Sequence, residues 1–83
     1  MQRPTPGVYR HYKGNLYLVL DTVKHSESEE TLVLYRCMYG NYDLWVRPLA
    51  NFLTPVDVNG EPVPRFFYER PATVEELAEL ALS

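Results

Sequence analysis

The 83-residue sequence lacks paired cysteines, long apolar runs and an apolar leader. Its one cysteine, Cys37, excludes an internal disulfide and agrees with a reducing compartment. No stretch approaches the roughly 18 consecutive apolar residues that a membrane span requires. The first residues, MQRPTPG, contain no apolar core of a secretory signal. We therefore expect a cytoplasmic protein that makes no membrane contact.

Cations are absent from residues 71–83, which carry Glu75, Glu76 and Glu79. The whole chain has 8 Lys and Arg against 11 Asp and Glu, a formal net charge of −3. The three tail glutamates account for that charge, so residues 1–70 are neutral overall. A neutral body argues against strong non-specific binding to nucleic acid, which needs many phosphate contacts. It leaves open a local group of basic side chains on one face.

The central stretch, residues 31–47 (TLVLYRCMYGNYDLWVR), predicts a β-hairpin. Two runs rich in Val, Leu, Tyr and Trp flank Gly40-Asn41, a pair typical of a two-residue hairpin turn. That register predicts the opposite pairs Tyr39 with Tyr42, Cys37 with Leu44, Arg36 with Trp45, Tyr35 with Val46, and Leu34 with Arg47.

The same register divides this hairpin into two faces. The predicted core face carries Val33, Tyr35, Cys37, Tyr39, Tyr42, Leu44 and Val46. The second face carries aromatic and cationic groups that a surface strand does not need in order to fold: Leu32, Leu34, Arg36, Met38, Asp43, Trp45 and Arg47. We therefore place the candidate binding surface on the second face.

Further β-structure is predicted on both sides of this hairpin. Residues 7–12 and 16–25 have strand patterns, and residues 49–52 form a corner whose Leu49 and Phe52 we expect to pack on the core. A second hairpin is predicted over residues 53–68 around Asn59-Gly60, with partner numbers that sum to 119. Its three prolines fall at non-bonded positions and predict a protected free edge: Pro55, Pro62 and Pro64. The aromatic residues that end it should anchor the strand: Phe66, Phe67 and Tyr68.

The tail predicts a helix over residues 73–82. Thr73 is a suitable N-cap, and Glu76 three residues later completes a capping box. Apolar residues follow at helical spacing: Val74, Leu77, Ala78, Ala81 and Leu82. Because isolated helices of this length are marginal in water, we expect this one to dock on the body or on a partner.

These patterns together predict a mainly β fold. Short successive strands, tight hairpins and a corner turn are typical of a small antiparallel SH3-like barrel, here over residues 7–70. A short C-terminal amphipathic helix follows, and residues 1–83 form a single domain. We expect a monomer or a weak homo-oligomer formed through that helix.

Catalytic and metal-binding chemistry finds little support in the sequence. His25-Ser26-Glu27 supplies suitable side chains, but consecutive residues of an extended chain point in alternating directions and do not form a triad. His11, His25 and Cys37 lack any recognised metal-ligand spacing. We therefore expect no catalytic residue, no metal and no cofactor. A nucleotide or small-molecule hydrolase that uses His25 and Glu27 with His11 stays open as an alternative.

A combination of short motifs over residues 7–68 resembles the signature of a small family of uncharacterised bacterial domains, a domain of unknown function. The residues that carry the resemblance are Gly7, Tyr9, His11-Tyr12-Lys13-Gly14, Tyr17, His25-Ser26-Glu27, Tyr35, Tyr39-Gly40, Trp45-Val46-Arg47-Pro48, Phe52 and Arg65-Phe66. It implies a bacterial or phage cytoplasmic protein and no established activity. The characteristic polar and aromatic positions that it singles out are His11, Lys13, His25, Glu27, Trp45, Arg47 and Arg65.

The residues and the resemblance together favour a small non-enzymatic binding module. Its aromatic and cationic face suits a nucleotide, a single-stranded nucleic acid or an acidic peptide segment, because bases stack on aromatic rings and anions pair with cations. A structural subunit-interaction domain is a second alternative beside the hydrolase. The expected ligand-binding residues are Trp45, Arg47, Arg36, His11, Lys13, His25, Glu27 and Arg65.

Overall fold

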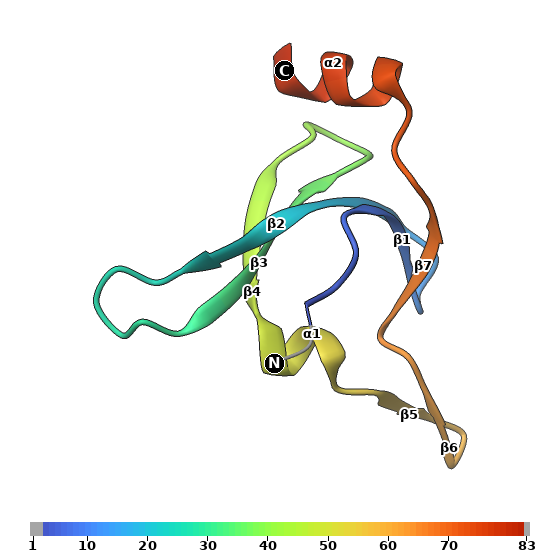
Figure 1. Cartoon of the computed structure of the whole chain (residues 1–83). Coiled ribbons are helices and arrows are strands. Elements are labelled where there is room, and N and C mark those ends of the chain that lie inside the picture. The colour runs from blue at the N-terminus through green and yellow to red at the C-terminus, as the bar shows by residue number, and fades with distance from the viewer. Residues whose placement is uncertain (1–2, 83) are drawn as a thin grey trace.

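The computed structural model describes the backbone of residues 3–82 and the side chains of residues 3–78. These residues measure 40 × 32 × 21 Å along their principal axes. The elements follow in the order β1 (Gly7–His11), β2 (Leu16–Lys24), β3 (Thr31–Cys37), β4 (Leu44–Pro48), α1 (Leu49–Leu53), β5 (Val56–Val58), β6 (Glu61–Val63), β7 (Phe66–Arg70) and α2 (Val74–Leu82). Figure 1 shows their arrangement.

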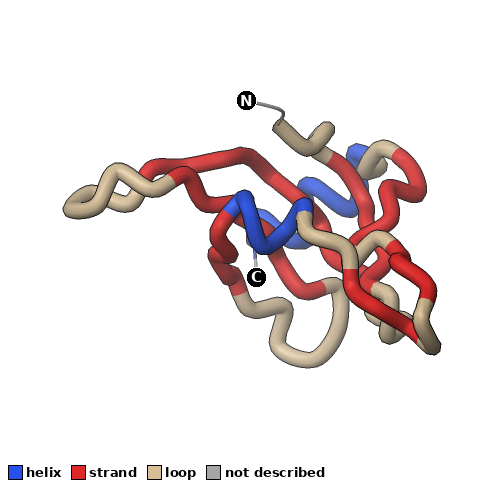
Figure 2. Tube along the Cα trace, turned by 90° about the horizontal axis from the view of Figure 1, so that it is seen from below, coloured by secondary structure: helices blue, strands red, loops and turns tan. Residues whose placement is uncertain are grey.

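Five strands form one antiparallel sheet in the order β4-β3-β2-β1-β7, while β5 and β6 form a separate two-stranded ribbon. Strand β2 is the longest and pairs with β1 through its first half and with β3 through most of its length. The far ends of β2 and β3 therefore project from the body as a hairpin, shown at the left of Figures 1 and 2. A register shift between Val19 and Asp21 leaves Leu20 as a bulge in β2.

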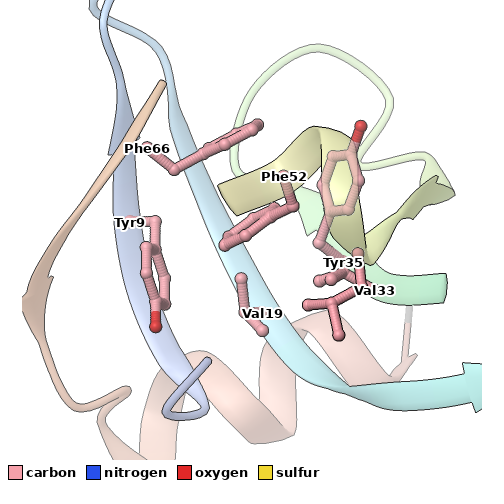
Figure 3. Packing of buried hydrophobic residues seen from close by; sticks show 7 residues of the cluster. Tyr9, Val19, Val33, Tyr35, Phe52 and Phe66 are labelled. Carbon is pink, nitrogen blue, oxygen red and sulfur yellow. The ribbon is translucent and has the colours of Figure 1, made fainter. Parts of the chain in front are cut away.

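Helix α1 packs on one face of the main sheet, which we call the α1 face. Its Leu49 and Phe52 are buried, as the sequence predicts for the corner after β4. They complete a cluster with Tyr9, Val19, Val33, Tyr35 and Phe66. Figure 3 shows Phe52 between Phe66 and the side chains of β2 and β3. The rings of Phe52 and Phe66 stack at 4.4 Å between centroids.

The opposite face of the sheet carries a smaller core. Val8 and Leu18 are fully buried there, against Leu16, Leu20, Met38 and Ala72. Helix α2 approaches this face, and a hollow of about 260 Å³ lies between Leu18, Leu20 and Leu77. The helix leaves Val74 82% exposed, so its apolar side is only partly covered.

The capping box at the start of α2 is confirmed. The Glu76 backbone N–H donates to Thr73 Oγ1 at 3.0 Å, and the Thr73 N–H donates to Glu76 Oε1 at 2.9 Å. Arg70, at the end of β7, forms an ion pair of 2.7 Å with the same carboxylate. The hydrogen bonds and this ion pair together fix the first turn of α2 against the end of the sheet.

The second hairpin is confirmed in register but is shorter than residues 53–68. Val56 pairs with Val63 and Val58 with Glu61, so partner numbers sum to 119 around Asn59 and Gly60. Both turn residues have positive φ, 54° and 83°, as a two-residue hairpin turn requires. Residues 66–70 leave this ribbon and pair with β1 instead. Only the first of the three expected anchors is buried, because Phe67 and Tyr68 are exposed and Phe66 packs on α1.

The central hairpin forms, but the predicted register is wrong by one residue. Tyr35 pairs with Trp45 and Arg36 with Leu44, so partner numbers sum to 80 rather than 81. The Cys37 N–H donates to the Asp43 carbonyl at 2.9 Å, which closes a loop over residues 38–42 in place of the two-residue turn. The longer loop needs two left-handed residues, Gly40 at φ 61° and Tyr42 at φ 56°.

The mainly β architecture with a short C-terminal helix is confirmed. Within residues 3–82 the edge strands β4 and β7 are not hydrogen-bonded to each other, so the main sheet is open. Neither helix in this part of the chain is long and apolar enough to cross a membrane.

Candidate functional site

The one-residue shift moves two of the predicted site residues to the other side of the sheet. Directly opposite residues of an antiparallel pair point to the same face. Because Trp45 lies opposite Tyr35, and Arg47 opposite Val33, both side chains belong to the α1 face. Arg36 stays on the opposite face with Leu44. The expected cluster of Arg36, Trp45 and Arg47 on one face is therefore wrong.

The same shift corrects the predicted core face. Leu44 and Val46 lie on the opposite face and are about half exposed, while Tyr39 and Tyr42 in the loop are also exposed. Val33, Tyr35 and Cys37 are buried as expected. Cys37 is a free thiol within the α1 face.

A hollow of about 230 Å³ opens on the α1 face. We call it the tyrosine hollow, and it is lined by Tyr17, Tyr35, Cys37, Tyr39, Trp45 and Arg47. The side chain of Tyr39 comes back from the loop over Tyr17, and their hydroxyl oxygens are 2.9 Å apart. This hydrogen bond, with some burial, raises the pKa of Tyr39, so the Tyr39 hydroxyl is neutral at physiological pH.

Trp45 forms the exposed wall of the tyrosine hollow. Its side chain is 53% exposed. Other rings of the α1 face pair edge to face, such as Tyr17 with Tyr35 at 5.4 Å between centroids. Trp45 takes part in no ring pair among the side chains that the structure describes. A flat indole surface is thus available to a planar group from outside.

Arg47 forms the cationic wall of the tyrosine hollow. Its guanidinium carbon is 5.2 Å from the centroid of the Phe66 ring, and one of its nitrogens donates to Asn51 Oδ1 at 2.7 Å. The stacking and the hydrogen bond hold the guanidinium in place. A positioned guanidinium can bind a carboxylate or a phosphate through its remaining N–H groups.

His11 lies beside this site at the end of β1, in ring contact with Phe66 at 5.0 Å and Tyr17 at 6.2 Å. Partial burial lowers the pKa of His11, and the nearby cations Arg47, Lys13 and Arg65 lower it further. Its Nδ1 accepts a hydrogen bond from the Lys13 backbone N–H at 3.2 Å, which places the proton of the neutral ring on Nε2. The charges that act on His11 are all positive, so this end of the α1 face attracts anions.

Arg65 and Lys13 flank the site without lining the tyrosine hollow. Arg65 lines a separate hollow of about 310 Å³ with Arg3, Tyr9 and Phe66, and its Nε donates to the Thr54 carbonyl at 3.3 Å. Lys13 Nζ lies 5.8 Å from the centroid of the Tyr12 ring. Both therefore contribute charge near His11 from the rim.

His25 and Glu27 lie in the loop between β2 and β3, at the tip of the projecting hairpin (Figures 1 and 2). His25 Nδ1 accepts hydrogen bonds from the backbone N–H groups of Glu27 at 3.1 Å and Ser28 at 3.3 Å, so its ring holds its own turn together. His11 lies near the other end of β2, and the eight steps between the nine residues of this strand, at about 3.3 Å each, separate its ends by roughly 25 Å. The structure does not bring His25 and Glu27 together with His11.

Arg36 is occupied within its own hairpin. Its guanidinium donates to the Tyr42 carbonyl at 2.7 Å, on the opposite face from Trp45. This contact ties the longer loop to β3. We therefore assign Arg36 to the loop and not to the binding surface.

A larger hollow, about 450 Å³, has a different character. It lies between the base of the projecting hairpin and α1 and is lined by Lys24, Glu29, Glu30, Thr31, Leu49, Ala50 and Leu53. It contains no aromatic ring, and its two glutamates outweigh its lysine. Although a large apolar pocket is a usual candidate for a binding site, this hollow has neither stacking groups nor a net positive rim.

The residues missed at the level of sequence are Tyr17, Tyr35, Tyr39 and Phe66. The predicted two-residue turn places Tyr35 and Tyr39 on the core face, away from Trp45. A five-residue loop in the same sequence puts Tyr35 and Trp45 on one face, so the missing information was the loop length. Among the described residues, no cluster of three or more His, Cys, Asp or Glu side chains is arranged to hold a metal ion.

Three comparisons with known proteins show what this chain is similar to. Residues 7–68 match the sequence profile of a family described as proteins of unknown function, DUF1653. The crystal structure of a protein of that family from Bordetella bronchiseptica is similar to this chain, with 39% sequence identity and a TM-score of 0.78. The similarity covers 88% of this chain and 96% of the Bordetella chain. No curated protein matches the sequence. The chain therefore belongs to the DUF1653 family.

Proposed function

We propose that this protein is a binding module whose tyrosine hollow takes a nucleotide, either free or as part of a single strand. The observation that carries the proposal is the pairing of an exposed, unstacked Trp45 with a fixed Arg47 on the wall of one hollow. A base can stack on the indole while a phosphate accepts hydrogen bonds from the guanidinium.

The surroundings of the hollow support the anionic part of this ligand. Lys13 and Arg65 add positive charge at the rim, and no carboxylate is among the groups that shift the pKa of His11. The hydroxyls of Tyr17 and Tyr39 can donate to or accept from a base edge. An acidic peptide would use the cations and leave the indole face unused.

We extend the proposal to the type of fold and to the cellular compartment. We infer that the open sheet, which wraps α1, is a relative of the SH3-like barrel whose edge strands have separated. We also propose a bacterial cytoplasmic setting, since the free thiol of Cys37 suits a reducing compartment and the similar crystal structure comes from a bacterium.

Trp45 is the only tryptophan, so its fluorescence reports directly on the hollow. We expect a short single-stranded oligonucleotide to quench that fluorescence in a saturable way at low salt. A nucleoside without phosphate should bind more weakly, because it lacks the group that Arg47 contacts. Quenching by poly-glutamate as strong as that by the oligonucleotide would favour an acidic peptide and contradict the proposal.

The structure provides a matched pair of charge variants. Arg47→Gln should weaken oligonucleotide binding by about tenfold, the typical effect of losing one charge-assisted hydrogen bond. Lys24→Gln removes one positive charge from the projecting hairpin and should leave binding within about twofold, as expected for a charge that does not contact the ligand. Equal losses in both variants would show a general charge effect, and the tyrosine hollow would not be the site.

A further inference from the structure

The outer edge of β4 is an apolar strand edge without a partner among the described residues. Leu44, Trp45 and Val46 are consecutive, apolar and each about half exposed, and within residues 3–82 no strand pairs with this edge. Exposed apolar edges are templates for pairing with another chain. Natural proteins therefore guard such edges or use them.

The other strand edges described within residues 3–82 carry features that hinder pairing. The β5–β6 ribbon carries Pro62 within its second strand and is flanked by Pro55 and Pro64. Strand β7 exposes Phe67 and Tyr68, but it carries the charges of Glu69 and Arg70, and a register shift interrupts its pairing with β1. β4 carries Arg47 and Pro48 only at its end, after the apolar run of residues 44–46, and it pairs with β3 in a regular register. The regular apolar stretch of β4 is therefore suited to pairing with another strand.

The backbone groups that β4 offers can be deduced from its pairing with β3. The hydrogen bond from Cys37 N–H to the Asp43 carbonyl makes that pair a bonded one. Bonded and non-bonded pairs alternate along an antiparallel ladder, so Trp45 and Arg47 also point their backbone groups toward β3. The N–H and C=O groups of Leu44 and Val46 therefore point outward.

We propose that a second copy of this chain covers the edge through an antiparallel β4–β4 pairing centred on Trp45. In this register Leu44 lies opposite Val46 of the second copy. All outward N–H and C=O groups of these two residues are then used, which gives four hydrogen bonds across the two-fold axis.

The side chains fit the same register on both faces. On the α1 face the two Trp45 rings are cross-strand neighbours, and Arg47 of each copy lies opposite Asp43 of the other. Asp43 is exposed and makes no ion pair among the described side chains. On the opposite face the half-exposed Leu44 and Val46 cover each other. Aromatic, apolar and opposite-charge cross-strand pairs all stabilise a sheet.

This dimer would place the two tyrosine hollows side by side on one continuous sheet face. The dimerisation proposal rests on the β4 edge and on the pairing of Asp43 with Arg47, and it does not depend on the proposed nucleotide binding. A dimer is therefore expected in the absence of an oligonucleotide.

Sedimentation equilibrium of the full chain tests the proposal. We expect the average mass to rise from that of one chain toward two across the micromolar to millimolar range. Asp43→Lys should raise the dissociation constant of the dimer by about tenfold. It places a positive charge opposite Arg47 of the other copy, and the two-fold symmetry repeats this repulsion at a second position. Asp57→Lys, the same substitution on the β5–β6 ribbon, is the matched control and should leave the constant unchanged.

Charge reversal tests the register. The double variant Asp43→Lys/Arg47→Glu exchanges the two charges and should restore dimerisation toward that of the original chain. Amide exchange supplies a second readout, because the Leu44 and Val46 amides should become protected only in the dimer. A mass of one chain at millimolar concentration would overturn the proposal, as would a dimer with unprotected Leu44 and Val46 amides or one that Asp43→Lys does not weaken.

Discussion

Trp45 and Phe52 are large aromatic side chains on the α1 face, and their different burial indicates different roles. Phe52 is 4% exposed and stacks on Phe66, whereas Trp45 is half exposed and stacks on nothing among the described side chains. A chain of this length has a total stability of about 4 to 12 kcal/mol. The packing of a single buried ring therefore contributes a large fraction of that stability.

We predict that Phe52→Ala lowers the free energy of unfolding by about 3 to 5 kcal/mol, because it leaves a cavity between α1 and the sheet. Trp45→Ala should lower it by about 1 kcal/mol or less, while removing the stacking surface and weakening oligonucleotide binding. Urea denaturation measures the change in the free energy of unfolding. Calorimetric titration with the oligonucleotide measures the change in binding and does not rely on Trp45 fluorescence. A Trp45→Ala variant as unstable as Phe52→Ala would assign Trp45 to the core.

His11 gives a prediction on pH. Its pKa in the folded protein lies below the ordinary 6.5 of the unfolded chain, so near that pH the unfolded state binds more protons than the folded state. The contribution of His11 to stability is therefore present above about pH 6.5 and is lost as pH falls toward the folded pKa. Arg47→Gln removes one of the cations that lower this pKa and should raise it, as followed by the ring protons of His11 in NMR. An unchanged or lowered pKa in that variant would contradict the placement of Arg47 beside His11.

The start of α2 gives a prediction at the scale of one element. Arg70 and the Thr73 backbone lower the pKa of Glu76 to about 2. A depressed carboxyl pKa stabilises the fold above the unfolded value near 4.5, and this contribution is lost as pH falls from about 4.5 toward 2. Thr73→Ala removes the side-chain cap and should cost the helix about 0.5 to 2 kcal/mol.

Amide exchange of residues 74–78 measures that loss at neutral pH. Glu76→Gln is the informative comparison, because Gln can still reach back to the Thr73 N–H but cannot pair with Arg70. Its effect should fall between those of the original chain and Thr73→Ala. A Thr73→Ala variant with unchanged exchange would show that the sheet, and not the cap, holds α2.

The projecting β2–β3 hairpin gives a second prediction at this scale. His25→Ala removes the acceptor of two backbone N–H groups in the turn. It should speed amide exchange of residues 26–30 and leave oligonucleotide binding unchanged, because the tip lies roughly 25 Å from His11 along β2. Loss of binding or of any nucleotide turnover in His25→Ala would favour the hydrolase alternative.

The two hairpins also show what a sequence can specify. Asn59-Gly60 is compatible with one tight turn, and its predicted register was confirmed. Gly40-Asn41 is compatible with several loops, and the choice depends on contacts far along the chain, where Tyr39 packs on Tyr17. Because a shift of one residue exchanges the faces of a strand, that tertiary contact separated Trp45 and Arg47 from Arg36. Three of the predicted site residues, Trp45, Arg47 and His11, thus lie near one another, and the length of the loop determines which side chains surround them.

At the scale of the whole molecule, charge is distributed so that binding should depend on salt. The net charge of −3 comes from residues 71–83, whereas Arg47, Lys13 and Arg65 lie around His11. If these three cations contact phosphates of a single strand, the logarithm of the binding constant should fall with the logarithm of salt concentration at a slope of about −2. Calorimetric titrations at several salt concentrations measure it. A slope near zero would mean that the ligand is held without these cations.

An amide and indole NMR titration with a short mixed-sequence RNA at low salt tests whether the tyrosine hollow is a nucleotide site. We expect saturable shifts at the Trp45 indole N–H and at the backbone of Tyr17, Tyr39 and Arg47. We expect no shifts at the side-chain N–H groups of Arg36 on the opposite face or at the amide of His25 on the projecting hairpin. Saturable shifts that centre on Arg36 or His25, or no shifts at any RNA concentration, would contradict the assignment of the tyrosine hollow as a nucleotide site.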